Sequence, residues 1–157
     1  MKRKLPIGAL EIPDDWEDRT TYQFVSPPAQ GLSMPMAAGR GVSVGSARTS
    51  VLVSRLVLPD KTSLDEYLRQ QVEELRRALP SLVLNSHDAW PHPTLGNVAT
   101  LDVTFEVGPG MTVRQLQFYL PLAQTGVCAN MTVSVAANQY EQKRAEVQKL
   151  LASFQPS

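Results

Sequence analysis

The sequence predicts an α+β fold in which two helices pack on one face of an antiparallel sheet and leave the other face open for binding. Two observations support this prediction. Several runs alternate apolar and polar residues and are separated by short turns, as is typical of neighbouring antiparallel strands. Two further segments each repeat apolar residues along one helical stripe. Stacking both stripes on the apolar face of one sheet buries them in two layers.

The N-terminal segment is expected to contain two strands. Residues 10–12 form the first, which ends at Pro13. Residues 20–26 form the second and place Tyr22 and Phe24 on one face of the strand.

A long loop follows these strands. Residues 27–48 are mostly proline, glycine, alanine, serine, methionine and valine, and a segment of this length without a periodic pattern indicates a loop. Residues 50–58 resume the strand pattern. We expect a single domain over residues 1–157, with the loop as an enlargement within it.

The first helix is predicted over residues 63–79. Ser63 is a favourable N-cap, Asp65 and Glu66 complement the helix dipole in the first turn, and Pro80 ends the helix. A second helix is predicted over residues 139–154, with Asn138 as its cap. The apolar stripes consist of Leu64, Leu68, Val72, Leu75 and Leu79 in the first helix, and of Tyr140, Val147, Leu150, Leu151 and Phe154 in the second.

Four strands are predicted between the helices. The first begins at residues 82–85, and glycine-containing turns separate the other three. The residues expected to face the core are Ala99, Leu101, Val103, Phe105 and Val107, then Leu116, Phe118 and Leu120, then Val127, Ala129, Met131, Val133 and Val135. The opposite face is expected to carry neutral polar groups: Thr100, Thr104, Gln115, Gln117, Asn130, Thr132 and Ser134, with Tyr22, Phe24 and Tyr119 as aromatic anchors.

This neutral face is suited to holding another polypeptide, because it offers hydrogen bonds without charge. A solvated sheet face usually carries more lysine and glutamate, although an ordinary solvated face stays open as an alternative. The face offers no nucleophile, general base or metal ligand, so we expect a binding protein and not an enzyme.

Composition excludes several other classes. Fifteen acidic residues balance fifteen basic ones, so the basic surface typical of nucleic-acid binding is missing. The single cysteine, Cys128, is expected inside a strand and fits a reducing cytoplasm. We expect no export signal, no membrane insertion, no metal and no cofactor.

The few titratable candidates favour structural roles. His87 and His92 lack companion metal ligands and are expected on the surface or in a turn. Asp102 and Glu106 share one strand face, a spacing that acid–base chemistry can use, although a solvated face is the commoner explanation. A small hydrolase that uses Asp102, Glu106 or His87 is the least favoured interpretation.

Several short motifs in this order resemble the DcrB-like group with the Mog1/PsbP-type fold. They are Leu-Glu-Ile-Pro-Asp-Asp-Trp-Glu-Asp-Arg at 10–19, Leu-Val-Ser-Arg at 52–55, Ser-Leu-Asp-Glu-Tyr-Leu at 63–68, Arg-Gln at 114–115 and Leu-Leu-Ala-Ser-Phe at 150–154. Within that group the chain is most similar to the Eag chaperones of bacterial type VI secretion.

The resemblance implies a cytoplasmic homodimer. It would bind the N-terminal transmembrane helices of a secreted toxin effector of the PAAR or Rhs type and keep them soluble before export. The family's binding positions are matched here by Tyr22, Phe24, Ser50, Ser54, Gln71 and Gln115, and Gln117 adjoins them on the same strand face. The alternative is a general DcrB/PsbP-like module that docks a folded protein and has no transmembrane client.

Overall fold

The computed structural model describes residues 2–5, 8–11, 21–25 and 49–155, the first three ranges as backbone strands. β1 (Lys2–Leu5) pairs with β2 (Gly8–Glu11) in a separate antiparallel ribbon. The predicted strand at 10–12 therefore overlaps β2. The predicted loop at 27–48 lies outside the described residues.

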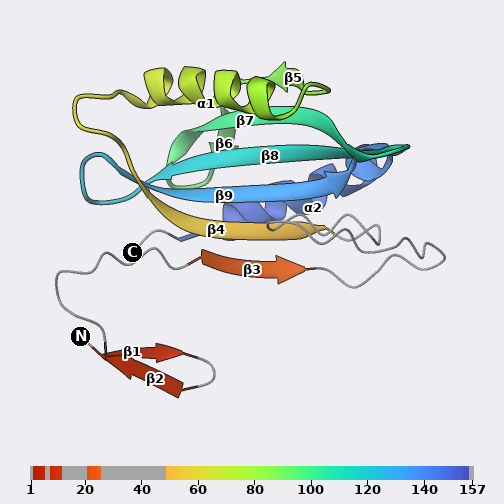
Figure 1. Cartoon of the computed structure of the whole chain (residues 1–157). Helices are drawn as coiled ribbons and strands as arrows, with labels where there is room; N and C mark the ends of the chain where they lie inside the picture. Colours follow the sequence, from red (N-terminus) through yellow and green to blue (C-terminus); the bar gives the residue numbers. More distant parts are fainter. Residues whose placement is uncertain (1, 6–7, 12–20, 26–48, 156–157) are drawn as a thin grey trace.

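A larger antiparallel sheet forms the body of the chain (Figure 1). Its strands run in the spatial order β3-β4-β9-β8-β7-β5, and β6 also pairs with β7. Their bounds are β3 Thr21–Val25, β4 Ser50–Val57, β5 Val83–Ser86, β6 Trp90–His92, β7 Gly96–Gly108, β8 Met111–Pro121 and β9 Val127–Ala136. The predicted α+β class and the antiparallel sheet are confirmed.

Both predicted helices are present. α1 (Leu64–Ala78) begins where predicted, because the Ser63 side chain accepts a hydrogen bond from the Glu66 amide at 3.2 Å. α2 (Tyr140–Ser153) begins differently, since a 3₁₀ turn, η1 (Ala137–Gln139), precedes it. Asn138 lies inside that turn, and no side chain caps α2, so the predicted cap is wrong.

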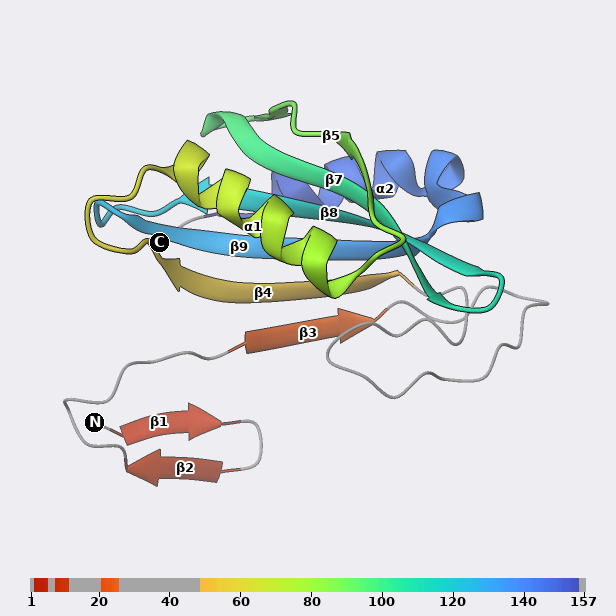
Figure 2. The same cartoon turned by 45° about the horizontal axis from the view of Figure 1, so that its top comes forward.

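The two helices lie on opposite faces of the sheet, and the prediction that they share one face is wrong. Val147 and Leu151 of α2 pack in one core cluster with Phe118 of β8. Leu68 and Val72 of α1 pack in another. In Figure 2, α1 crosses in front of the sheet and α2 lies behind it. The molecule therefore has three layers, with a core on each face of the sheet.

A single extra residue in β7 explains this error. The register shifts between Glu106, which pairs with Thr112, and Gly108, which pairs with Met111. Beyond this bulge Leu101 stands opposite Gln117. Without the extra residue, the pairing of Gly108 with Met111 would continue so that Leu101 stood opposite Phe118, on the predicted common face. A shift of one residue moves every side chain of a strand to the other face.

The alternation within each strand was thus predicted correctly, and only its phase between strands was not. The apolar residues Leu101, Val103 and Phe105 of β7 face α1 and build the core on that side. Their polar neighbours Thr100 and Asp102 face α2 instead, where they are buried at 1% and 4% exposure.

Neither helix of the described residues combines the length and the apolar character that a membrane crossing requires.

Candidate functional site

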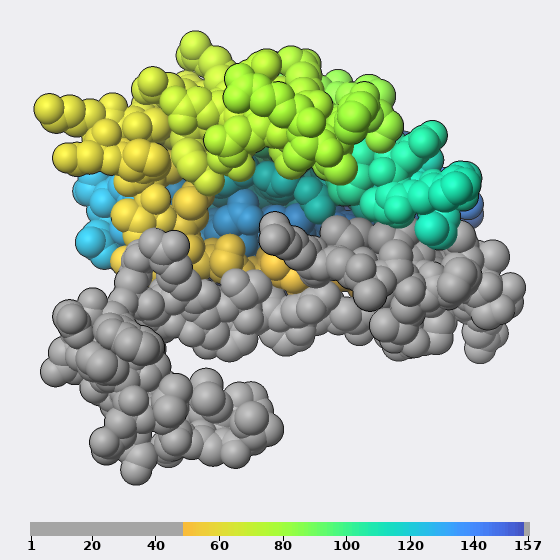
Figure 3. All heavy atoms as spheres, in the orientation of Figure 1, coloured from red at the N-terminus to blue at the C-terminus, as the bar shows by residue number. Residues whose placement is uncertain are grey.

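A groove of about 310 Å³ lies on the α1 face of the sheet, between α1 and β4. α1 packs over Leu101 of β7 and Tyr119 of β8. Beside it, Gln117, Asn130 and Thr132 are half-buried. Figure 3 shows blue atoms of β9 in the recess below the green and yellow surface of α1. The lining residues are Ser54, Arg55 and Leu56 of β4, Tyr67 and Gln71 of α1, Gln115, Gln117 and Tyr119 of β8, and Asn130 and Thr132 of β9.

A ladder of side-chain hydrogen bonds forms the floor of the groove. The Tyr119 hydroxyl donates to Gln117 Oε1 at 2.7 Å, Gln117 Nε2 donates to Gln115 Oε1 at 2.8 Å, and Gln115 Nε2 donates to Ser134 Oγ at 3.2 Å. Residues two apart on a strand point the same way and lie within reach of a glutamine side chain. Every bond in this ladder therefore joins neutral groups that the strand pattern itself brings together.

A second polar row on β9 adjoins the ladder. Thr132 Oγ1 donates to Asn130 Oδ1 at 3.0 Å. Asn130, Thr132 and Ser134 stand directly opposite Tyr119, Gln117 and Gln115 in the register. The two strands thus present one continuous neutral patch of amides and hydroxyls.

Aromatic and aliphatic groups form the walls. The Tyr67 ring meets the Tyr119 ring edge-on, with centroids 6.2 Å apart, and Leu56 packs in the same cluster. Burial raises the pKa of Tyr119 far above its usual value, and burial is also the main cause of the raised pKa of Tyr67. Both phenols stay protonated at neutral pH, so this part of the groove carries hydrogen-bond donors without charge.

Four of the predicted binding residues converge in this groove: Ser54, Gln71, Gln115 and Gln117. Ser54 comes from β4, Gln71 from α1 and the two glutamines from β8, so three separate segments contribute. Gln71 also donates through Nε2 to Glu74 Oε2 at 3.3 Å. Gln115 is only 9% exposed, so in this structure its amide belongs to the floor more than to the open surface.

Among the predicted binding residues whose side chains the structure describes, Ser50 is the one that does not line the groove. Ser50 pairs with Ser134 but is buried at 2% exposure and is not a lining residue. In the backbone register, Tyr22 pairs with Val53 and Phe24 with Val51. The side chains of Tyr22 and Phe24 lie outside the described part of the chain, so their role stays a prediction.

Thr100 and Thr104, predicted on the same neutral face, are also displaced from it. Thr100 is buried on the α2 face and donates to the Val98 carbonyl at 2.9 Å. Thr104 accepts a hydrogen bond from Asn85 at 2.7 Å. The bulge in β7 moves both threonines away from the glutamines.

Tyr67 is the groove residue that the sequence interpretation missed. It precedes Gln71 by four residues in α1, and residues four apart share one face of a helix. That spacing was the available signal. Tyr67 was overlooked because the apolar stripe of α1 suggested a helix that only covers a core.

Two of the titratable candidates, Asp102 and His92, have structural partners. Asp102 is held by Arg114 in a two-pronged ion pair, with distances of 2.9 Å and 2.7 Å. His92, expected on the surface or in a turn, is 6% exposed, and its Nδ1 accepts hydrogen bonds from the amides of Thr94 and Leu95. Among the described residues, no three histidine, cysteine or acidic side chains gather as a metal site would require.

Comparisons with known proteins place this geometry in a family. The family model described as DcrB matches residues 8–153. The chain is similar to the crystal structure of PA94, a protein of unknown function from Pseudomonas aeruginosa. That likeness has a TM-score of 0.68 at 16% identity and covers 100% of this chain and 96% of that one. It shows a shared fold. No curated protein sequence matches the chain.

Two further solved structures have lower similarity. The solution structure of cyanobacterial PsbP from Synechocystis sp. PCC 6803 has a TM-score of 0.46 at 10% identity, covering 94% of this chain and 96% of that one. LpqN of Mycobacterium tuberculosis, described as involved in cell envelope biogenesis, has a TM-score of 0.43 at 12% identity, covering 90% and 85%.

Proposed function

The chain belongs to the DcrB family, and on that premise we propose that it is a cytoplasmic chaperone of type VI secretion. Its client is a toxin effector of the PAAR or Rhs type. The groove beside α1 receives the effector's N-terminal transmembrane helices and shields them from water before export. Release follows when a competing acceptor takes over the helices, so no nucleotide is required.

The observation that supports this proposal best is the neutral, internally bonded floor of the groove. A client helix that covers the groove removes the remaining water from Gln117, whereas Gln115 and Tyr119 beside it are already buried at 9% and 3% exposure. Leaving a buried polar group without a partner costs about 1–3 kcal/mol. Here the three side chains already form hydrogen bonds with one another and with Ser134. Covering them therefore leaves few polar groups without a partner. The one charged side chain of the lining, Arg55, is exposed and does not belong to this floor. A floor of charged side chains would incur a much larger desolvation cost.

The chemistry of the groove also matches that of a transmembrane helix surface. Such helices associate through close packing of small residues and through hydrogen bonds from serine, threonine, asparagine and glutamine. The groove offers these polar types beside Leu56 and the Tyr67 ring. It therefore imitates a neighbouring helix within a membrane protein.

The groove, with a volume of about 310 Å³, is too small to enclose a client helix. An α-helix with its side chains is about 10–12 Å across, so a client helix rests on the groove and keeps most of its own surface outside it. The proposal therefore includes a homodimer, in which a second copy covers further client surface.

Co-expression tests this function. The protein is expressed with the N-terminal hydrophobic segment of a PAAR or Rhs toxin, and we expect a soluble complex without detergent. Gln115→Ala removes the acceptor of Gln117 Nε2 and the donor to Ser134 Oγ, and Ser54→Leu fills the groove. Both variants are expected to reduce the yield of complex. Gln148→Ala, an exposed glutamine on α2, is the matched control. An unchanged yield with both groove variants would contradict the proposal.

The runner-up function is docking of a folded protein, and the restricted opening favours it. α1 covers part of the sheet face, and Gln115 is 9% exposed, so the accessible strip is narrow. A client captured by the wild-type protein and released by Ser54→Leu, but containing no apolar helix, would identify this function instead.

A further inference from the structure

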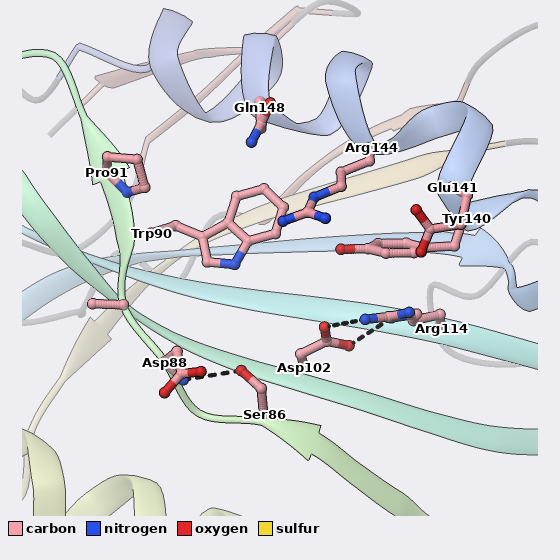
Figure 4. A pocket seen from close by; sticks show the side chains of 11 residues that line it. Ser86, Asp88, Trp90, Pro91, Asp102, Arg114, Tyr140, Glu141, Arg144 and Gln148 are labelled. Carbon is pink, nitrogen blue, oxygen red and sulfur yellow. Dashed lines mark hydrogen bonds and ion pairs between the residues drawn. The ribbon is translucent and has the colours of Figure 1, made fainter.

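A second pocket, of about 330 Å³, lies on the opposite side of the sheet beside α2 (Figure 4). Residues from the β5–β6 region, β7, β8 and α2 line it. Its charged members are Asp88, Asp102, Arg114, Glu141 and Arg144, and its aromatic members are Trp90 and Tyr140. This pocket is separate from the groove, and nothing in the proposed function uses it.

Two of the five charges neutralise each other. Arg114 binds both carboxylate oxygens of Asp102, and Asn85 Nδ2 donates to Asp102 Oδ1 at 3.0 Å. The Arg114 guanidinium also stacks on the Tyr140 ring, 3.5 Å from its centroid. This pair forms a fixed wall of the pocket.

The Tyr140 hydroxyl is a hydrogen-bond donor of the pocket that has no protein partner among the described residues. Tyr140 is 3% exposed, yet its hydroxyl makes no hydrogen bond within the described part of the chain. Buried polar groups in proteins almost always have a partner. Figure 4 shows the hydroxyl directed into the pocket, toward Trp90. Burial is the main cause of the raised pKa of Tyr140, so the group is a neutral phenol that can donate a hydrogen bond.

The remaining charges have both signs. The Arg144 guanidinium lies 5.9 Å from the centre of the Trp90 ring and makes no ion pair with the described residues. Asp88 and Glu141 contribute two exposed carboxylates to the same lining. A simple anion would meet the two carboxylates, and a simple cation would meet Arg144. A ligand with both charges can pair with Arg144 and, at its other end, with a carboxylate of the lining.

We propose that this pocket binds a small zwitterionic ligand that carries a carboxylate and an ammonium group, as a free amino acid does. The carboxylate pairs with Arg144 and accepts the Tyr140 hydroxyl proton in a hydrogen bond. The ammonium group pairs with Asp88, which lies across the pocket from Arg144 (Figure 4). Trp90 packs against the carbon chain between them, and charge-assisted contacts of this kind are stronger than neutral ones.

Titration followed by NMR of the tryptophan indole N–H groups tests the proposal. The chain has two tryptophans, and Trp90→Phe assigns their signals. Glycine, β-alanine and γ-aminobutyrate are added in turn, because they separate the two charges by increasing lengths. Acetate and butylammonium are the single-charge controls. At least one zwitterion is expected to saturate the Trp90 shift with a Kd of about 1 mM, and both controls are expected to bind more weakly.

Variants then identify the contacts. Tyr140→Phe removes one hydroxyl and keeps the ring, and it is expected to weaken binding about fivefold, the effect of one hydrogen bond. Arg144→Gln is expected to abolish saturation, whereas Lys149→Gln, an exposed charge on α2 outside the lining, leaves it unchanged. No saturable shift with any zwitterion, equal binding of acetate, or equal affinity of the Arg144→Gln variant would overturn the proposal.

Discussion

Replacement of Asp102 by alanine is expected to destabilise the protein strongly, because it leaves Arg114 without its partner on the α2 face. Arg114 donates through Nε and Nη2 to the two carboxylate oxygens, and Asn85 donates to one of them. The Asp102 side chain is 6% exposed, so water reaches little of the space that the carboxylate leaves.

The magnitude follows from the burial of the two partners. Removing one partner of a fully buried ion pair costs about 3–5 kcal/mol. The Arg114 side chain is 25% exposed toward the pocket, so water solvates part of its charge. We therefore expect a loss of about 2–3 kcal/mol. In a chain of this size each kcal/mol lowers Tm by about 2–4 °C, so Tm should fall by about 4–12 °C.

Urea denaturation of a double-mutant cycle measures this loss. Asp102→Ala, Arg114→Met and the double variant are compared with the wild type, and the double variant is expected to lose less than the sum of the single losses. Glu73→Ala is the control, because its ion pair with Arg76 is more than half exposed on both sides and should cost less than about 0.5 kcal/mol. An equally small cost for Asp102→Ala, or strictly additive losses, would refute the reasoning.

Three further predictions concern the sheet and its turns. Because burial raises the pKa of Tyr119 above the ordinary 10.0, the contribution of Tyr119 to the free energy of unfolding should be fully present below pH 10.0 and fall above it, as the unfolded chain ionises. Tyr119→Phe should therefore reduce the loss of stability above pH 10.0, measured as urea midpoints. Cys128 is buried, and burial also raises the pKa of its thiol. Its rate of reaction with a thiol reagent should therefore be limited by the rate at which the protein unfolds around it, and rapid labelling in native buffer would contradict this. Gly110→Ala should lower the free energy of unfolding by about 1 kcal/mol, because the φ of 70° at this position is strained for any residue with a Cβ atom. Gly108→Ala should lower the free energy of unfolding less, because the added Cβ meets the flexible end of the Met111 side chain. Equal losses for the two variants would contradict this account.

The elements that depend on local patterns were predictable from the sequence. The start of α1 follows from Ser63 and the acidic first turn, and the strands β7, β8 and β9 follow from their alternation. These signals lie within one segment each and need no knowledge of neighbouring strands.

The layer arrangement was not predictable, because it depends on one extra residue in β7. The alternation of β7 reads the same with or without a bulge, yet the bulge decides whether Leu101 faces α1 or α2. Two apolar faces, one for each helix, are therefore a consequence of register and not of composition.

The candidate site was predicted in part. Gln115 and Gln117 share one strand face by simple alternation, and the resemblance added Ser54 and Gln71, which the structure places beside them. The hydrogen bonds between the two glutamines and Tyr119 were not foreseen, because side-chain partners depend on rotamers that a sequence pattern does not specify.

The most direct test of the central claim is photo-cross-linking of the client from the groove. A photoreactive amino acid replaces Gln71 on the groove wall in one variant and Gln148 on α2 in the other, and each is co-expressed with the effector's N-terminal hydrophobic segment. The account predicts that the segment cross-links from position 71 and not from position 148. Cross-linking from position 148 alone, or from neither position in a soluble complex, would contradict it.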